Sequence, residues 1–163
     1  MNQSGNMLMK CIVCATRGGE GSRAAQMAAI RQARRTGKPL VFLYVTDPYS
    51  MGDVDELLLP ALRAELNWLG RTLLQVAKQR AESAGLLSHV EIREGRVQEE
   101  IGHFLRASDA ELLILGAPRG ATANIFGDDA VEQFAHAIQS ETGIEVMVVR
   151  PELHEAAGFG KES

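Results

Sequence analysis

Five short apolar segments alternate with longer segments of helical period, and this alternation constrains the fold of the 163-residue chain more than any other feature. The apolar segments are rich in Val, Ile and Leu and span residues 7–15, 40–46, 89–94, 111–116 and 144–150. Strands separated by helices pair in parallel, because each crossover helix returns the chain to the same edge of the sheet. We therefore expect an α/β fold: a single-domain, doubly wound, five-stranded parallel sheet with helices on both faces.

Four helices are predicted between these strands. Ser22 is a candidate N-cap for the first, which runs to about Thr36. The second begins near Pro60 and ends at Gly85. Its apolar stripe comprises Leu62, Leu66, Leu69, Leu73 and Val76. Trp68 lies one position from this stripe, so we expect it to pack at the edge of the core. Two shorter helical patterns follow, at residues 97–105 and 130–138.

Composition narrows the class of protein. With 45% apolar residues the chain can bury one full core, which we assign to residues 7–151 between a flexible N-terminus (1–6) and a flexible tail (152–163). The 17 basic and 21 acidic residues give a net charge of -4 without a basic cluster, so we expect no nucleic-acid partner. No apolar run reaches membrane-spanning length and residues 1–7 do not resemble a secretory signal. We therefore expect a cytoplasmic protein without membrane association.

Cys11 and Cys14 have the C-x-x-C spacing of redox and zinc sites. They lie within a predicted strand, where side chains three residues apart point to opposite faces. Such a pair is poorly placed to share a metal or to form a disulfide. We interpret both residues as buried free thiols in a reducing compartment.

Two glycine-rich loops follow predicted strands: "ATRGGEGS" (15–22) after the first and "GAPRGATANIFGD" (116–128) after the fourth. In a doubly wound sheet, ligands bind beyond the carboxyl ends of the strands where the winding reverses direction. Each loop also leads into a helix start, whose unpaired N–H groups suit anions. The glycines either let a ligand approach the backbone or only permit tight turns, and the sequence leaves both interpretations open.

The order of elements across residues 7–151 resembles that of the universal stress protein family. The segment "REGRVQEEIGHFLRASDAELLILGAPRG" (93–120) is similar to the family's glycine, helix with paired acids, Ala-Asp, apolar strand and Gly-x-x-Gly. Residues 41–48 resemble its second strand and residues 144–151 its last. The resemblance implies a homodimer formed through the last strand, here residues 144–150. An apolar strand left as an open edge also favours pairing.

The resemblance further implies a site for an adenine nucleotide, ATP or AMP. ATP-binding members carry Gly-x2-Gly-x9-Gly-Ser/Thr after the fourth strand, an Asp ending the first strand, and a backbone contact to adenine at the end of the second. Carried onto this chain, the nucleotide-binding residues are Val45, Gly116, Arg119, Gly120 and Gly127.

This chain departs from the family's pattern at several positions. Three residues rather than two separate Gly116 from Gly120, and six rather than nine separate Gly120 from Gly127. Thr16 stands where the first strand would end in Asp, and Asp128 stands where Ser or Thr would contact phosphate. The loop after the fourth strand is therefore rebuilt.

Asp128 and Asp129 allow two interpretations of that loop. A carboxylate 4 Å from a phosphate charge is repelled by about 1 kcal/mol in bulk water, and by more in a partly buried site. Bound Mg²⁺ would reverse the sign by joining the carboxylates to phosphate, so nucleotide binding would depend on the metal. Without a metal, the two aspartates cap the following helix. Arg17, Arg23 and Arg119 are candidate counter-charges to phosphate.

Three functions remain. The resemblance implies a cytosolic stress-response protein that binds an adenine nucleotide at the loops after strands 1 and 4. The altered loop favours a second function, a dimeric interaction module of the same fold that has lost nucleotide binding. The third is an enzyme, since "RGGEGS" (17–22) is faintly similar to the loop of ATP pyrophosphatases, although Arg17 and Gly21 replace its Ser and Asp. The four histidines are scattered, with no catalytic or metal-binding spacing, so we expect no enzymatic activity.

Overall fold

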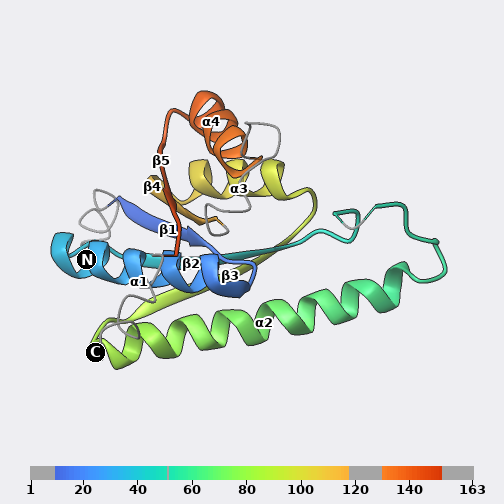
Figure 1. The fold of residues 1–163 in the computed structure, drawn as a ribbon, viewed down its shortest axis with the longest axis horizontal. Coiled ribbons are helices and arrows are strands. Elements are labelled where there is room, and N and C mark those ends of the chain that lie inside the picture. Colours follow the sequence, from blue (N-terminus) through green and yellow to red (C-terminus); the bar gives the residue numbers. More distant parts are fainter. Residues whose placement is uncertain (1–9, 51, 118–129, 152–163) are drawn as a thin grey trace, which may run out of the picture.

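The computed structural model describes residues 10–50, 52–117 and 130–151, and these form one five-stranded sheet with helices on both faces (Figure 1). The sheet has the order β3-β2-β1-β4-β5, and every neighbouring pair is parallel. Its strands are β1 (Cys11–Ala15), β2 (Leu40–Thr46), β3 (Ser88–Glu94), β4 (Ala110–Gly116) and β5 (Glu145–Val149). The predicted α/β fold is confirmed. Residues 1–6 and 152–163 lie outside the described part, so their predicted flexibility stays a prediction.

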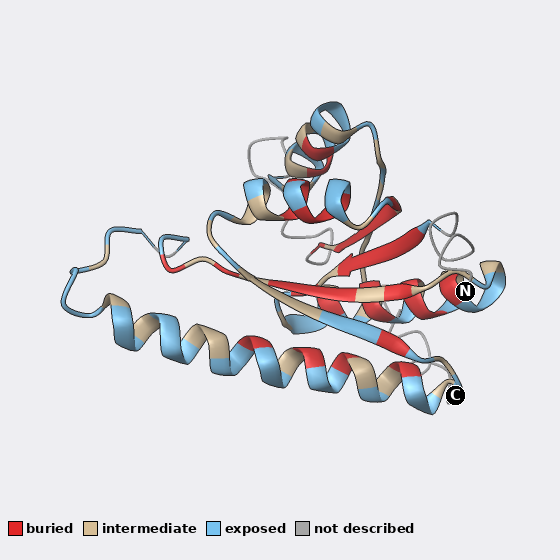
Figure 2. Cartoon of the chain, turned by 180° about the vertical axis from the view of Figure 1, so that it is seen from behind, coloured by how far each residue is buried: buried red, intermediate tan, exposed pale blue. Residues whose placement is uncertain are grey.

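Helices cover both faces of the sheet (Figure 1). One layer holds α1 (Gly19–Thr36) and α2 (Leu59–Ser83), and the other holds α3 (Val97–Ala107) and α4 (Ala130–Thr142). The central strands are buried between these layers (Figure 2), which explains why their sequences are almost continuously apolar. Among the helices that the structure describes, none has the length and apolar character of a membrane span.

Strand β1 divides its side chains between two cores. Ile12 and Cys14 pack in the core beneath α1 and α2, whereas Cys11 and Val13 pack in the core beneath α3 and α4. Both cysteines are buried and free, as predicted. Burial raises the pKa of the Cys14 thiol to about 12, and it also raises the pKa of Cys11. The two thiols are therefore protonated structural side chains rather than a redox or metal pair.

Helix α1 begins four residues earlier than the sequence predicts, and Ser22 is not its N-cap. The helix starts at Gly19, and its N-cap is Gly18. Gly18 and Gly19 have φ angles of 91° and 88°, a conformation that glycine adopts without strain and that turns the chain into the helix early. Ser22 lies in the first turn, where its Oγ accepts a hydrogen bond from the backbone N–H of Arg17 at 3.1 Å.

The expectation that Trp68 packs at the core edge is wrong, because 66% of its surface is exposed. The buried positions of α2 are Gly70, Leu74, Ala77 and Ala81, and they are not the predicted leucine stripe. Three of these positions are small, Gly70, Ala77 and Ala81, and let the helix approach the sheet closely, while Trp68 and Leu69 are exposed. The N-terminal half of α2 also reaches beyond the strands, so less of the sheet is available to cover it (Figure 1).

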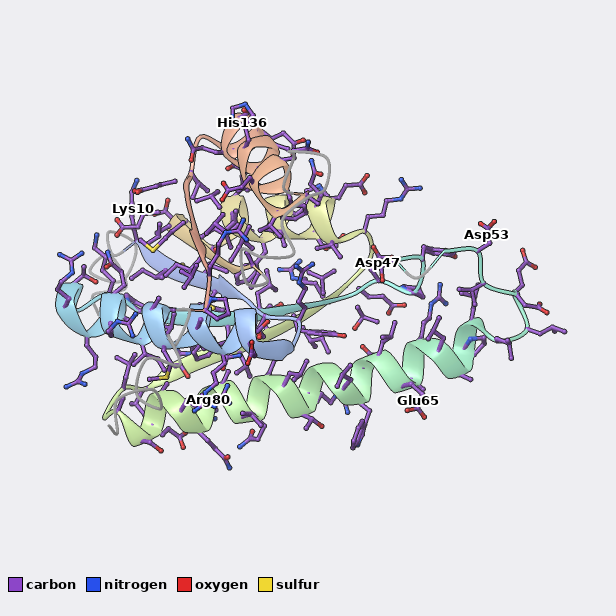
Figure 3. The ribbon with its side chains drawn as sticks, in the orientation of Figure 1. Lys10, Asp47, Asp53, Glu65, Arg80 and His136 are labelled. Atoms are coloured by element: carbon purple, nitrogen blue, oxygen red, sulfur yellow. The ribbon has the colours of Figure 1, made fainter. Side chains whose placement is uncertain are left out.

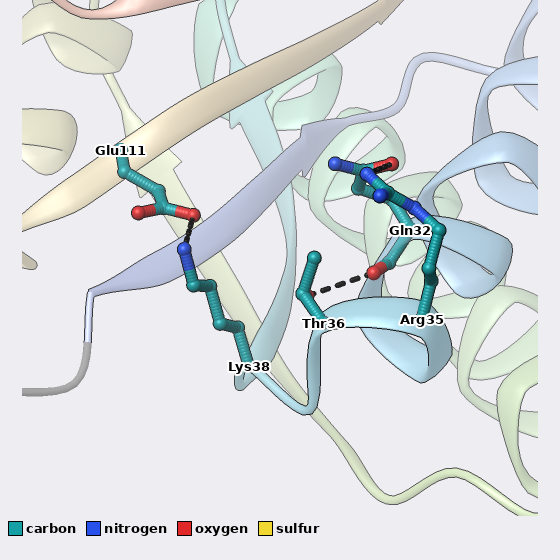
Figure 4. Close-up of polar contacts among 5 residues, drawn as sticks. All are labelled: Gln32, Arg35, Thr36, Lys38 and Glu111. Atoms are coloured by element: carbon teal, nitrogen blue, oxygen red, sulfur yellow. Dashed lines mark hydrogen bonds and ion pairs between the residues drawn. The ribbon is translucent and has the colours of Figure 1, made fainter.

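Polar contacts at the amino ends of the strands are structural (Figure 4). Lys38, just before β2, forms an ion pair with Glu111 on β4 and so bridges the strands on either side of β1. At the end of α1, the Thr36 hydroxyl donates to the carbonyl of Gln32 at 2.8 Å. Gly37 then ends the helix in the left-handed conformation with φ of 69°. The amino ends of these strands thus carry structural contacts, and the candidate site lies at the carboxyl ends.

Candidate functional site

A cavity of about 700 Å³ lies at the carboxyl ends of β1, β2 and β4. The winding of the sheet reverses between β1 and β4, which are neighbours in space although two strands separate them in sequence. Doubly wound sheets bind ligands at this reversal. The volume is that of a small-molecule site, which is typically about 300–1,000 Å³. The cavity is therefore the candidate binding site.

The structure brings together only part of the predicted site. Val45 at the end of β2 and Gly116 at the end of β4 both line the cavity. Arg17, predicted as a counter-charge to phosphate, also lines it. The remaining predicted residues, Arg119, Gly120, Gly127, Asp128 and Asp129, lie outside the described residues. Their assignment to nucleotide or to Mg²⁺ therefore stays a prediction.

Apolar side chains from both layers form much of the cavity wall. They come from β2, α2, α3 and α4, and include Leu43, Leu66, Ile101 and Phe134. An apolar wall of this kind excludes water from a flat aromatic group, while a few polar groups fix its orientation. The cavity thus combines an apolar wall with polar and charged side chains.

Two cationic side chains line the cavity from different strands. Arg17 follows β1, is exposed, and its guanidinium forms no ion pair with a described residue. Arg150 follows β5 and lies 3.7 Å from Glu132. Arg23 does not line the cavity and lies near Arg80. Burial, and to a smaller extent the charge of Arg23, lowers the pKa of Arg80. Of the two predicted counter-charges that the structure describes, Arg17 lines the cavity and Arg23 does not.

Close backbone contact explains two of the glycines. A Cβ atom on Gly116 would lie 2.3 Å from the carbonyl oxygen of Gly21, and a Cβ on Gly21 would lie 2.5 Å from that of Ala117. The first turn of α1 and the end of β4 therefore touch directly. The sequence left open whether these glycines serve a ligand or a turn. The structure adds a third reason, the packing of one backbone segment against another.

Asp47, which the sequence analysis did not single out, lies at the cavity where β2 ends (Figure 3). Its Oδ2 accepts a hydrogen bond from the backbone N–H of Val97 at 3.3 Å, and its Oδ1 accepts one from that of Tyr49 at 3.0 Å. The carboxylate thus satisfies an unpaired N–H at the start of α3 from another element. The only signal in the sequence is an Asp directly after a strand, which does not reveal a partner 50 residues away.

Thr16, which follows β1, anchors a buried polar chain at the cavity. Its Oγ1 accepts a hydrogen bond from Gln26 Nε2 at 2.8 Å. In turn, Gln26 Oε1 accepts one from Nη1 of Arg80 on α2 at 2.5 Å. Thr16 and Gln26 are both almost fully buried, and Arg80 reaches them from the long helix below α1 (Figure 3). Within residues 10–50, 52–117 and 130–151, no cluster of His, Cys, Asp or Glu is placed to hold a metal ion.

Comparison with known proteins identifies similar folds. The model of the universal stress protein family matches residues 9–150. A member of this family from Burkholderia pseudomallei is 23% identical, with a TM-score of 0.63 over 89% of this chain and 98% of its own. Universal stress protein UspA from Lactobacillus plantarum is 18% identical, with a TM-score of 0.70 over 87% of this chain and 98% of its own. No curated protein sequence matches.

Some of the similar structures contain nucleotides. A family member from Arabidopsis thaliana, solved with AMP bound, is 13% identical, with a TM-score of 0.61 over 88% of this chain and 93% of its own. Two further universal stress protein structures are complexes with cAMP and with dAMP. At these identities the structures show the shared fold.

Proposed function

Because this chain belongs to the universal stress protein family, we propose that it is a cytoplasmic stress-response protein that binds an adenine nucleotide, ATP or AMP. The observation that carries the proposal is the cavity of about 700 Å³ at the reversal point of the sheet, which joins an apolar wall to Arg17 and Arg150. Related structures that hold AMP, dAMP or cAMP support the same ligand class. In this proposal Val45 supplies a backbone contact to adenine, and Gly116 with Arg119, Gly120 and Gly127 surrounds the phosphates.

Calorimetry with ATP, ADP and AMP tests the proposal, with Mg²⁺ and again with a chelator, after mass spectrometry has excluded co-purified nucleotide. We expect saturable binding of one nucleotide per chain. Arg17→Gln should weaken ATP binding about 10-fold to 100-fold, because a hydrogen bond to a charged group contributes about 1.5–3 kcal/mol. Arg31→Gln is the matched control, since Arg31 is an exposed residue of the same helix layer that does not line the cavity. Absence of binding in both conditions would reject the proposal in favour of an interaction module of the same fold.

The comparison between binding with Mg²⁺ and binding with chelator tests the role of Asp128 and Asp129. Binding that disappears with chelator assigns the two carboxylates to a metal bridge between protein and phosphate. Equal binding in both conditions assigns them to helix capping. We further propose that the bound nucleotide is not turned over, and steady release of phosphate or pyrophosphate would contradict this.

We also propose that the protein is a homodimer that pairs through β5. This strand is one edge of the sheet, and the exposed fraction of Met147 on it is 36%. Met147→Lys should shift sedimentation toward the monomer, because pairing would bring two added charges together at the edge. The matched control is Val90→Lys on β3, the opposite edge, where 42% of the side chain is exposed. A folded Met147→Lys variant that still sediments as a dimer would rule out this interface.

A further inference from the structure

The first half of α2 and the segment before it extend beyond the strands (Figure 1). Three large apolar side chains on this projection are strongly exposed: Leu57 to 87%, Leu58 to 59% and Trp68 to 66%. Glu65, one helical turn before Trp68, points away from the sheet (Figure 3). Single exposed apolar residues are ordinary on a protein surface, whereas several on one projecting element are typical of an interaction surface. This projection is therefore a candidate contact with another molecule.

Leu57 and Trp68 lie on one side of the projection together with Ala61 and Ala64. The four residues recur at intervals of four, three and four, which places them on the same side of a helix. The helical conformation extends back to Leu58, and Leu57 directly precedes it. All four residues are exposed, and we call them the outer face of α2. This face has a large side chain at each end and two alanines between them.

The outer face of α2 is complementary to a second copy of itself in antiparallel orientation. A twofold axis midway between Ala61 and Ala64 places Trp68 of one copy against Leu57 of the other, and the same contact forms again on the far side of the axis. The alanines meet at the axis, where small side chains let two helices approach closely. Both large apolar side chains of each copy are then covered.

Charges next to the outer face favour the same antiparallel orientation. Arg71 lies one helical turn beyond Trp68 and is exposed. The segment at the other end of the face carries three exposed acidic residues, Asp53, Asp55 and Glu56. An antiparallel pair brings Arg71 of each copy to the acidic segment of the other, whereas a parallel pair would bring like charges together. The charges therefore specify which way the second copy lies.

We propose that the outer face of α2 binds a second copy of this chain as an antiparallel helix pair. The inference goes beyond the proposed function, because no residue of this face lines the cavity or belongs to β5. A contact through one helix face is smaller than the roughly 1,200–2,000 Å² of a stable interface, so we expect a dissociation constant of about 10–100 µM. Dimers formed through β5 would then associate further only at high protein concentration.

Trp68 is the only tryptophan of the chain, so its fluorescence reports on this contact. We expect its emission to shift to shorter wavelength as the concentration of purified protein rises through the expected dissociation constant, because the ring leaves water. Quenching of the emission by acrylamide should decrease over the same range. Sedimentation of the same samples should show the further association directly.

Ala64→Lys tests the close approach of the two helices at the axis. It places a charge from each copy where the helices meet, so it should weaken the association at least about 10-fold. Gln79→Lys is the matched control, because it adds the same charge at an exposed position of α2 about three turns beyond Trp68 and on the same side. This control should associate like the wild type. Thermal denaturation checks that both variants are folded.

Exchanging two charges tests the orientation of the pair. Arg71→Glu should weaken the association about 5-fold, because the new carboxylate would meet the acidic segment of the other copy. Adding Asp53→Arg to the same chain should restore the affinity to within about twofold of the wild type, since an opposite charge then faces each carboxylate. A double variant that associates as weakly as Arg71→Glu alone would reject the antiparallel pair.

Met147→Lys separates this contact from pairing through β5. At high concentration it should retain the change in Trp68 emission, although it sediments as a monomer when dilute. The proposal is overturned if wild-type emission and sedimentation do not change with concentration, if Ala64→Lys associates like the wild type, or if Met147→Lys abolishes the change. None of these measurements involves nucleotide, so this inference and nucleotide binding stand or fall separately.

Discussion

Replacing Gly116 with alanine is expected to lower the free energy of unfolding by about 3 kcal/mol, because the added methyl group overlaps backbone atoms that cannot move independently. Its Cβ would lie 2.3 Å from the Gly21 carbonyl oxygen and 2.7 Å from the backbone nitrogen of Ser22. Gly116 does not have a positive φ, so alanine meets no backbone strain there, and the whole effect comes from this contact. For a domain of this size, the melting temperature should fall by roughly 6–12 °C.

A double-mutant cycle shows whether the contact is the cause. Gly21→Ala should also be destabilising, since its Cβ would lie 2.5 Å from the Ala117 carbonyl oxygen. The double variant should lose less stability than the sum of the single variants, because separating α1 from β4 once relieves both overlaps. Chemical denaturation measures all three. Strict additivity would contradict the proposed contact, and so would a Gly116→Ala variant as stable as the wild type.

Much of the fold follows from local pattern. The predicted strand at residues 40–46 agrees in both bounds with β2, because a strand buried on both faces is a continuous apolar segment between turn residues. The start of helix α1 follows less directly from the sequence pattern. Ser22 has the side chain of an N-cap, but Gly18 and Gly19 adopt conformations open mainly to glycine and begin the helix earlier. The capping preference of Ser22 favours a later start of α1, but the backbone conformations of Gly18 and Gly19 set the observed start.

The site was less predictable, because its contacts join residues far apart in the chain. Nothing in the sequence near Thr16 indicates that Gln26 links it by hydrogen bonds to Arg80 on another helix. The contact between Gly21 and Gly116 likewise exists only once β1 and β4 lie side by side. The family resemblance supplied Val45 and Gly116, and both line the cavity. Two residues of the resemblance thus lie at the cavity, whereas its polar contacts depend on the tertiary structure.

Helix α2 shows the same division between pattern and packing. Its leucine period predicts a helix correctly, but it does not reveal which side of the stripe faces the sheet. Gly70 decides this, because a residue without a side chain lets α2 approach the ring of Tyr44. A Cβ at this position would lie 2.4 Å from the Tyr44 ring. This close contact helps to set the rotation of α2, and with it the exposed position of Trp68 two residues earlier.

Gly70→Ala should therefore destabilise the protein by about 2 kcal/mol, although alanine in a helix interior is intrinsically favoured over glycine by about 1 kcal/mol. The Tyr44 ring is buried and cannot swing away without moving α2. Tyr44 also lines the cavity, so displacement of α2 should weaken nucleotide binding in the same variant. Thermal denaturation and calorimetry on one protein preparation measure both effects.

Two comparisons isolate the clash from helix propensity. Gly102→Ala in α3 is the matched control and should be neutral or stabilising. Its Cβ would meet the flexible end of Arg106 at 3.2 Å and Cγ2 of Thr142 at 3.9 Å, which is ordinary van der Waals contact. In a Tyr44→Leu background the ring is absent, so Gly70→Ala should cost much less stability than in the wild type, or even increase it. An equal effect of Gly70→Ala in both backgrounds would show that Tyr44 does not set the distance between α2 and the sheet. In that case the rotation of α2, and with it the exposure of Trp68, would need a cause other than the missing side chain at Gly70.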